Sequence, residues 1–221
     1  MSRLLSRFLA TLALVGCAAD NAAGTSRTVE AAVRVEANGC GQVTKLAGGS
    51  FIAEDRVVTV AHAVAGATAI VVVSSDGHRH DATVVGIDRR KDLALLAVVG
   101  GKIAPLPLAS MVVDDAGEFV VFRDGTPVLT TFVTRRQVGI KMDSIDEDGI
   151  SVRRGYQIEA DVVSGDSGAV LAIDGAATAV VFARSRSVDG RAWATDINEI
   201  KPLLAADTGK PVDRGACSEF A

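Results

Sequence analysis

Gly165-Asp166-Ser167-Gly168 is a tight-turn signal that stands directly before an apolar run. Taken alone it could be an ordinary loop, because glycine, aspartate and serine are common turn residues. Two earlier residues make it informative: His62 directly follows one apolar run, and Asp92 directly precedes another. Three chemically reactive side chains therefore stand in the order His, Asp, Ser, each at the boundary of a predicted strand.

These three residues have the properties of an activated nucleophile. A serine hydroxyl is a poor nucleophile at its ordinary pKa, so Ser167 would need a neighbouring base. The imidazole of His62 suits this role because histidine titrates near neutral pH, and the carboxylate of Asp92 would fix its tautomer. The glycine-containing turn would let the N–H groups of Gly165 and Ser167 form an oxyanion hole for a tetrahedral intermediate.

The order of the three residues separates the folds that use such a triad. An α/β-hydrolase has its histidine after the serine, and no histidine follows Ser167. The order of subtilisin requires an aspartate before the histidine, where only Asp20 and Asp55 occur. Asp20 lies in a predicted tether, and Asp55 is only seven residues from His62. The remaining order, His-Asp-Ser, is that of the chymotrypsin class.

The rest of the chain favours an all-β fold. About a dozen short apolar runs rich in valine and alanine are separated by turns such as Ser75-Asp76-Gly77. Separate strands are expected at residues 150–152 and 156–162. Only residues 195–206 have a helical pattern, in which Asp196 is the predicted cap and Pro202 an interruption.

Four segments resemble the signature segments of the trypsin-like serine peptidases: Gly48-Gly49-Ser50-Phe51-Ile52, Thr59-Val60-Ala61-His62, Asp92-Leu93-Ala94-Leu95-Leu96 and Gly165-Asp166-Ser167-Gly168. The intervals of 30 residues from His to Asp and 75 from Asp to Ser are similar to those of bacterial members such as the high-temperature-requirement proteases. The resemblance implies two six-stranded antiparallel β-barrels of the chymotrypsin type, an active site between them and a short C-terminal helix. It also implies a catalytic triad of His62, Asp92 and Ser167, with the oxyanion hole at Gly165 and Ser167.

The resemblance further implies a substrate preference. Asp161, six positions before Ser167, matches the base of the primary specificity pocket and would favour Arg or Lys before the scissile bond. The alternative is a structural ion pair between Asp161 and either Arg184 or Arg186.

Two positions depart from the family pattern. Ala169 stands where glycine is usual, and a positive φ there would cost about 1 kcal/mol. Ser164 stands where bacterial relatives often have proline, so the loop before the nucleophile is expected to be less rigid. No Ile-Val-Gly-Gly sequence occurs near the domain start, so activation by insertion of a new N-terminus is not expected. The group that pairs with Asp166 is therefore open.

The first 17 residues, MSRLLSRFLATLALVGC, predict a secreted lipoprotein. Two arginines precede an apolar stretch of nine residues, too short to span a bilayer and typical of a signal peptide. Leu14-Val15-Gly16-Cys17 resembles the bacterial lipobox, in which the cysteine is acylated; an ordinary signal peptide is the alternative. We expect a signal peptide at residues 1–16, a lipid-anchored tether at residues 17–31 and a peptidase domain at residues 32–221.

Assignment of Cys17 to lipid leaves two cysteines, Cys40 and Cys217, which allow a single pairing. The expected compartment is the bacterial cell envelope, on the extracytoplasmic side of a membrane, and such an oxidising environment permits a disulfide. The bond would stabilise the domain by about 4–5 kcal/mol on the chain-entropy model. The alternative is a pair of buried free thiols.

Composition narrows the partners. The chain has 27 acidic and 23 basic residues and no basic run, which argues against nucleic-acid binding. His78 and His80 could share one face of a strand, but no third ligand is evident, so neither a metal nor another cofactor is expected. The expected partners are a protein or peptide substrate and the membrane through Cys17, with the protein itself a monomer.

The sequence thus predicts a membrane-tethered serine endopeptidase that acts through an acyl-enzyme intermediate. One alternative is a catalytically weak or inactive peptide-binding lipoprotein with the same fold. Another is a structural lipoprotein with no proteolytic role.

Overall fold

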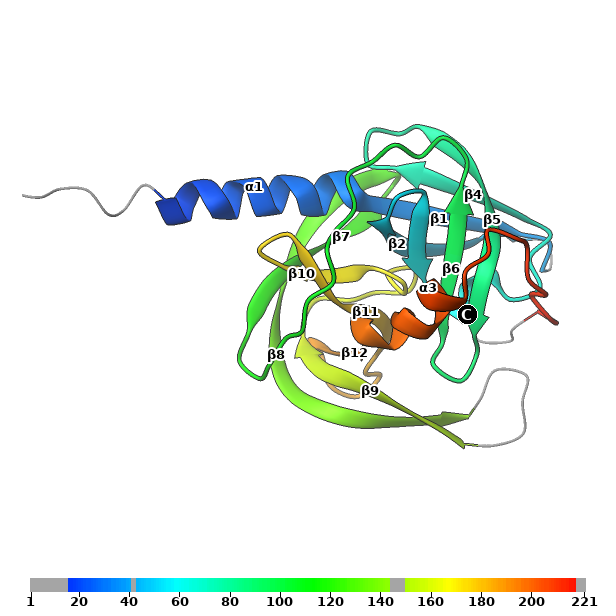
Figure 1. Ribbon diagram of the computed structural model, residues 1–221. Helices are drawn as coiled ribbons and strands as arrows, with labels where there is room; N and C mark the ends of the chain where they lie inside the picture. The colour runs from blue at the N-terminus through cyan, green and yellow to red at the C-terminus, as the bar shows by residue number, and fades with distance from the viewer. Residues whose placement is uncertain (1–15, 41–42, 144–149, 218–221) are drawn as a thin grey trace, which may run out of the picture.

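The structure, a computed structural model, describes residues 16–217 with the exception of residues 41–42 and 144–149. Its strands form two antiparallel six-stranded barrels, one from each half of the chain, which confirms the predicted all-β fold (Figure 1). The signal peptide expected at residues 1–16 lies outside the described residues except for Gly16, and so do Leu14 and Val15 of the lipobox.

The first barrel has the strand order β1-β2-β3-β6-β5-β4 and closes where β1 pairs with β4. Its strands are β1 (Ala32–Asn38), β2 (Lys45–Ala53), β3 (Arg56–Thr59), β4 (Ala69–Ser74), β5 (Arg79–Asp88) and β6 (Leu93–Val98), with the one-turn helix α2 (Ala61–Val64) after β3. Leu93, Leu95 and Leu96 of β6 are fully buried, because the core around them continues into second-barrel residues such as Val180. A strand buried on both faces explains why this segment is a continuous apolar run.

The second barrel has the order β10-β11-β12-β9-β8-β7 and closes where Ala172 of β10 pairs with Glu118 of β7. Its strands are β7 (Ala116–Arg123), β8 (Thr126–Asp143), β9 (Ile150–Glu159), β10 (Val170–Ile173), β11 (Ala176–Arg184) and β12 (Arg191–Asp196). Its interior contains Phe119, Phe132, Tyr156 and Ile158, all buried.

Strand β9 differs from the prediction of two separate strands at residues 150–152 and 156–162. The expected break coincides with Gly155, which pairs with Val138 of β8 and Thr195 of β12 inside a continuous sheet. A β-carbon at Gly155 would collide with Ile140 and with the Ala194 carbonyl oxygen. The glycine therefore marks close packing between strands and not a turn.

The C-terminal segment is only partly the predicted helix. Residues 195 and 196 end strand β12, which the sequence did not predict, and Asp196 then caps the short 3-10 helix η1 (Ile197–Ile200) by accepting a hydrogen bond from the Asn198 N–H at 2.9 Å. Helix α3 (Lys201–Ala206) follows, with Pro202 in its first turn. Proline is well tolerated there because the first helical N–H groups have no partner inside the helix.

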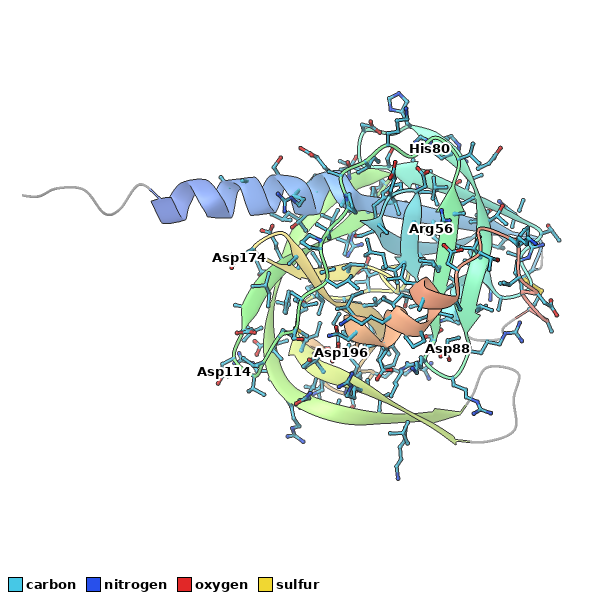
Figure 2. The ribbon with its side chains drawn as sticks, viewed as in Figure 1. Arg56, His80, Asp88, Asp114, Asp174 and Asp196 are labelled. Atoms are coloured by element: carbon cyan, nitrogen blue, oxygen red, sulfur yellow. A yellow bond between two sulfur atoms is a disulfide. The ribbon has the colours of Figure 1, made fainter. Side chains whose placement is uncertain are left out.

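The segment expected to be a tether forms helix α1 (Gly16–Ala31), which extends away from the barrels in Figure 1. Its C-terminal half packs against both barrels: Thr28 is buried, Ala31 joins the core around the first barrel, and the Thr25 hydroxyl donates to Glu118 of β7 at 2.9 Å. Gly24 lies against the backbone of the turn between β10 and β11 at Asp174, a residue labelled below α1 in Figure 2. Across the described residues, no helix is both long and apolar enough to cross a bilayer.

The predicted disulfide is confirmed. Cys40 and Cys217 are bonded, with Cα atoms 5.5 Å apart and a sequence separation of 177 residues. The bond ties the end of β1 to the C-terminal segment after α3 and so closes nearly the whole domain.

Candidate active site

His62 and Asp92 are in direct contact at one end of the first barrel. His62 lies in α2, directly after β3, and Asp92 immediately precedes β6, the neighbour of β3. The His62 Nδ1 atom is 2.8 Å from Asp92 Oδ2 and 3.1 Å from Oδ1, and the His62 backbone N–H donates to Oδ1 at 2.9 Å. Asp92 is buried and has a φ of +54°, a left-handed conformation that aspartate adopts more readily than most residues.

This contact fixes the chemistry available to the imidazole. An ionised carboxylate only accepts hydrogen bonds, so the proton of the neutral ring lies on Nδ1 and the lone pair on Nε2. The same carboxylate accepts the His62 backbone N–H, which fixes its position next to the ring. Rotation of the ring would break the contact between Nδ1 and this carboxylate. The pair can therefore take a proton at Nε2 and stabilise the imidazolium that results.

Ser167 lies in the loop of residues 163–168 between β9 and β10, which we call the nucleophile loop. Gly165 and Gly168 have φ of +95° and +93°, which favour glycine. A β-carbon at Gly168 would collide with the Gly48 carbonyl oxygen, so only glycine fits there. The Ser167 hydroxyl donates to the Phe182 carbonyl oxygen at 3.3 Å, so β11 holds it on one side.

Gly48 of β2 joins the nucleophile loop to the strand that leads to His62. Its N–H donates to the Ser167 carbonyl oxygen at 2.7 Å, and its own carbonyl oxygen accepts from the Thr59 hydroxyl at 2.7 Å. Thr59 ends β3, three residues before His62. The structure therefore brings the two barrels together at one residue that bridges the histidine and serine segments.

Two backbone N–H groups of the nucleophile loop are available. Among the described residues, neither Gly165 nor Ser167 uses its N–H in a hydrogen bond, whereas the Gly168 N–H donates to the Val181 carbonyl oxygen at 2.7 Å. Free N–H groups on either side of one residue are suited to bind a negatively charged oxygen.

Comparison with known proteins places this arrangement in a family. Residues 47–181, more than half of the chain, match the family model of the trypsin-like peptidase domain. The chain belongs to the trypsin-like serine peptidases. Serine protease Rv3671c of Mycobacterium tuberculosis (strain ATCC 25618 / H37Rv) is 33% identical over 175 residues, which cover 76% of this chain and 44% of that protein. The chain thus spans less than half the length of the curated relatives it matches.

Solved structures agree with this assignment. The active form of the Rv3671c protease from M. tuberculosis superposes with a TM-score of 0.81 and 28% identity, over 98% of this chain and 100% of that one. A serine endoprotease from Yersinia pestis has a TM-score of 0.69 over 84% of this chain and 65% of that one; at 17% identity this likeness shows the fold alone.

In this trypsin-like peptidase, Asp166 pairs with Arg123, a partner that the sequence did not reveal. Arg123 Nη1 and Nη2 donate to the two Asp166 carboxylate oxygens at 2.5 Å and 2.8 Å, and the Val163 N–H donates to Oδ2 at 2.8 Å. The hydrogen bond to Asp166 raises the pKa of Arg123 further above its ordinary value, and the charge of Asp161 adds to this effect. The ion pair ties the nucleophile loop to the end of β7.

The backbone conformation of Ala169 differs from the strained one that the family pattern suggested for this position. It is buried and does not have a positive φ; within the nucleophile loop only Gly165 and Gly168 do. The expected cost of about 1 kcal/mol depended on a positive φ, so it does not apply. Its N–H instead donates to the Asp166 carbonyl oxygen at 3.0 Å, which closes the turn around Ser167.

Asp161 lies on the surface between β9 and β10. Its charge raises the pKa of Arg123, and among the described residues it forms no ion pair with Arg184 or Arg186. Arg123 thus experiences two carboxylates, one buried and one exposed.

A buried cation packs on Phe182, the residue whose carbonyl oxygen accepts the Ser167 hydrogen bond. The guanidinium of Arg153, from β9, stacks on the ring of Phe182 at 4.1 Å from the centroid, and both residues are buried. Burial lowers the pKa of Arg153, and the charge of Asp92 acts in the opposite direction. Phe182 thus contacts Ser167 through its carbonyl oxygen and Arg153 through its ring.

The other histidines lie away from this site. His78 is exposed and pairs with Asp76 at 2.9 Å, and His80 Nδ1 is 3.3 Å from the Val99 carbonyl oxygen. Within the described part of the chain, no group of three or more His, Cys, Asp or Glu side chains is placed to hold a metal ion.

Proposed function

We propose that this protein is a serine endopeptidase in which His62, Asp92 and Ser167 form the catalytic triad. The observation that carries the proposal is the two-point contact of Asp92 with the His62 ring and backbone. That contact orients Nε2 as a base, while Gly48 holds the Ser167 segment beside the strand that ends before His62. Membership of the trypsin-like family supports the same roles.

The proposed reaction begins when His62 Nε2 takes the proton of Ser167 as its Oγ attacks the carbonyl carbon of the substrate. The N–H groups of Gly165 and Ser167 would stabilise the oxyanion that develops on the carbonyl oxygen. The imidazolium then gives its proton to the leaving amine, and an acyl-enzyme remains. Water, deprotonated by the same nitrogen, hydrolyses the ester and restores the free hydroxyl.

A fluorophosphonate probe tests the nucleophile, the base and the oxyanion hole together. We expect labelling of the parent, and a loss of at least about 10³-fold in labelling rate and in peptide hydrolysis for Ser167→Ala, His62→Ala and Asp92→Asn. Combined variants should lose little more than single ones, because the residues act as a unit. Ser187→Ala and His78→Ala, which change an exposed serine and an exposed histidine, serve as matched controls. Full hydrolysis by Ser167→Ala would refute the proposal.

One observation favours the alternative of a weak or inactive peptide binder: the Ser167 hydroxyl is directed to the Phe182 carbonyl oxygen. Catalysis would require the hydroxyl to rotate toward His62. If the parent binds peptides but neither reacts with the probe nor cleaves them, the alternative is correct.

We also propose that the signal peptide at residues 1–16 is removed and that Cys17 is acylated, which would tether the domain to the extracytoplasmic side of a bacterial membrane. The disulfide supports an oxidising compartment. Mass spectrometry of the mature N-terminus is the direct test. Cys17→Ser should release the domain into the soluble fraction or leave it unprocessed, and a cleaved but unacylated Cys17 would refute the anchor.

The preference for Arg or Lys before the scissile bond is proposed on the position of Asp161 in the chain. A peptide library compares the parent with Asp161→Ala. An unchanged preference for small apolar residues in both proteins would refute it.

A further inference from the structure

A cavity of about 90 Å³ opens beside the nucleophile loop. Its walls are Arg34, residues 46–48, residues 120–122, residues 164–166 and Ala169. β1 and β2 thus form one wall, β7 another, and the nucleophile loop the third. None of the wall residues comes from β11, the strand whose Phe182 carbonyl oxygen accepts the Ser167 hydrogen bond. Ser167 itself is not a wall residue; the cavity reaches the nucleophile loop at residues 164–166, directly before it.

Given the proposed function, the position of the cavity indicates which part of a peptide substrate would lie next to it. The leaving amine takes its proton from His62, which belongs to the first barrel, so the peptide on the leaving-group side must pass over first-barrel residues. β2 pairs with the strand that leads to His62, and it supplies residues 46–48 to the cavity. An extended peptide advances about 3.3 Å per residue, so a cavity at the nucleophile loop is within reach of the first two residues after the scissile bond.

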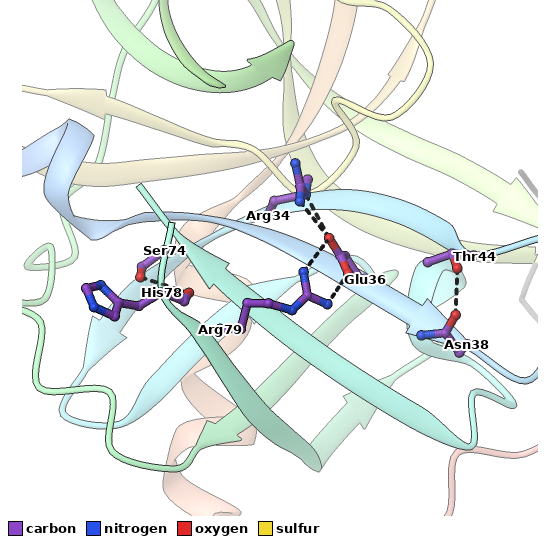
Figure 3. Close-up of polar contacts among 7 residues, drawn as sticks. All are labelled: Arg34, Glu36, Asn38, Thr44, Ser74, His78 and Arg79. Atoms are coloured by element: carbon purple, nitrogen blue, oxygen red, sulfur yellow. Dashed lines mark hydrogen bonds and ion pairs between the residues drawn. The ribbon is translucent and has the colours of Figure 1, made fainter. Parts of the chain in front are cut away.

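Arg34 gives the cavity its charge. Arg34 Nε and Nη2 donate to Glu36 Oε1 at 3.1 Å and 2.6 Å, and Arg79 Nη2 donates to Glu36 Oε2 at 2.7 Å. Figure 3 shows the two guanidinium groups converging on one carboxylate. Hydrogen bonds from Arg79 and Arg34 hold the pKa of Glu36 below its ordinary value. Two cations share one anion, so the cluster keeps one net positive charge.

The third nitrogen of the Arg34 guanidinium, Nη1, is held in place because the other two bind Glu36. A guanidinium has five N–H donors, and the two groups bound to Glu36 leave Nη1 available. Among the described residues, Nη1 donates no hydrogen bond; it lies beside Gly125 in the turn between β7 and β8. The Arg34 side chain is 20% exposed and Glu36 is 14% exposed, so the cation is partly desolvated and already ordered. Such a group binds an anion with a small loss of side-chain entropy.

The other charges nearby do not cancel this one. Asp166 lines the cavity, but both its oxygens bind Arg123. Asp124, next to Gly125, is exposed, and in the described part of the chain it forms no ion pair with Arg34. Water screens an exposed carboxylate, so its effect on Arg34 is weak.

We propose that this cavity binds a carboxylate of the peptide substrate on the leaving-group side of the scissile bond, and that Arg34 is its cationic partner. The volume equals roughly three water molecules, which is enough for a carboxylate with one or two methylene groups. Leu46 and Val120 provide apolar contacts for those methylenes. The carboxylate comes either from an Asp or Glu side chain within two residues after the bond or from the C-terminus of a short substrate.

Matched peptides test the proposal. Substrates with Glu or Gln at each of the first two positions after the scissile bond differ in charge but hardly in shape. We expect the parent to prefer Glu at one of them by about tenfold in kcat/KM, the effect of one hydrogen bond to a charged group. Arg34→Met should abolish that preference, while Arg79→Met should keep it. Arg79 is the matched control because it binds the same Glu36 but is 55% exposed and does not line the cavity.

A second comparison separates the two sources of the carboxylate. Short peptides that end two residues after the scissile bond are prepared as free acids and as amides, with Gln in place of Glu. A preference for the free acid that Arg34→Met removes assigns the cavity to the C-terminal carboxylate. A preference confined to Glu side chains assigns it to an acidic side chain.

Measurement of peptide binding tests the carboxylate site independently of catalysis. In Ser167→Ala, fluorescence anisotropy compares the Glu and Gln peptides with and without Arg34→Met. If the parent fails to react with fluorophosphonate but the Glu peptide binds about tenfold more tightly through Arg34, the proposed function fails and the carboxylate site stands. If the parent cleaves both peptides equally, or if Arg34→Met keeps the preference, the carboxylate site is refuted and the peptidase stands.

Discussion

Arg123 binds both carboxylate oxygens of Asp166 from a position 43 residues earlier in the chain. The Asp166 side chain is 2% exposed, while that of Arg123 is 38% exposed. Asp166 directly precedes Ser167, and its carboxylate also accepts the Val163 N–H. The ion pair therefore ties the residue between Gly165 and Ser167 to the end of β7.

Replacement of Arg123 by methionine should slow catalysis and weaken the fold. The substitution leaves the buried Asp166 carboxylate with backbone contacts alone. Loss of one partner of a buried ion pair costs about 3–5 kcal/mol; because Arg123 is partly exposed, we expect roughly 1–3 kcal/mol in the free energy of unfolding. We also expect a reduction of about ten- to a hundredfold in fluorophosphonate labelling, because an N–H group of the proposed oxyanion hole would be misplaced.

Arg135→Met is the matched control for this prediction. Arg135 binds Glu159 at 2.6 Å, but both side chains are largely exposed. Its loss should change stability by less than about 1 kcal/mol. Equal labelling rates for Arg123→Met and the parent would show that the ion pair does not position the loop.

The raised pKa of Tyr156 makes the stability of the fold depend on pH in the alkaline range. Burial raises its pKa to about 12, and its hydroxyl donates to the Met111 carbonyl oxygen at 3.1 Å. The folded protein keeps the phenol proton to higher pH than the unfolded chain, whose tyrosine titrates near 10.0. The stabilisation is therefore complete below pH 10 and is lost as pH rises from 10 to about 12.

Tyr156→Phe should remove this component of the pH dependence. At neutral pH we expect a loss of about 1 kcal/mol for the missing hydrogen bond, and a smaller fall in stability than the parent shows above pH 10. Denaturant unfolding across this range measures both effects. Because Tyr156 is the only tyrosine, the phenolate absorbance of the native parent reports its titration directly. Titration near pH 10 in the folded protein would contradict the prediction.

The Cys40–Cys217 disulfide should account for much of the stability of the domain. Its 177-residue separation predicts a loss of about 4–5 kcal/mol in Cys40→Ser, because the open unfolded chain gains entropy. In denaturant unfolding without reductant, the parent should be more stable than Cys40→Ser. With reductant, which breaks the bond in the parent, the two unfolding curves should coincide. Coincident curves without reductant would show that the bond does not stabilise the domain.

Elements with a local or motif-based signal were predictable from the sequence. Leu93 and its apolar neighbours predicted β6 because that strand is buried on both faces, and Asp196 predicted a helix cap because its side chain acts on the N–H two residues ahead. The His62–Asp92 contact followed from the order of reactive residues at strand ends.

Features that depend on packing between distant segments were not predictable. Arg123 meets Asp166 only because β7 and the nucleophile loop lie side by side in the second barrel, and no local pattern encodes that pairing. Gly155 carries the same signal whether it breaks a strand or allows close packing within one. Gly24 belongs to a polar, alanine-rich segment typical of a tether, yet it permits a helix to contact a β-turn.

Contact between helix α1 and the second barrel depends on that glycine. A β-carbon at Gly24 would lie 2.9 Å from the Asp174 carbonyl carbon, and neither backbone can move without disturbing the turn. Gly24→Val should therefore detach the C-terminal half of α1, expose Thr28, and lower the free energy of unfolding by roughly 1–3 kcal/mol. Ala23→Val introduces the same side chain one residue away on the exposed face, so it should cost only about 0.5 kcal/mol of helix propensity. Hydrogen exchange of residues 24–31 measures the detachment, and equal protection in the two variants would show that α1 is not held by this contact.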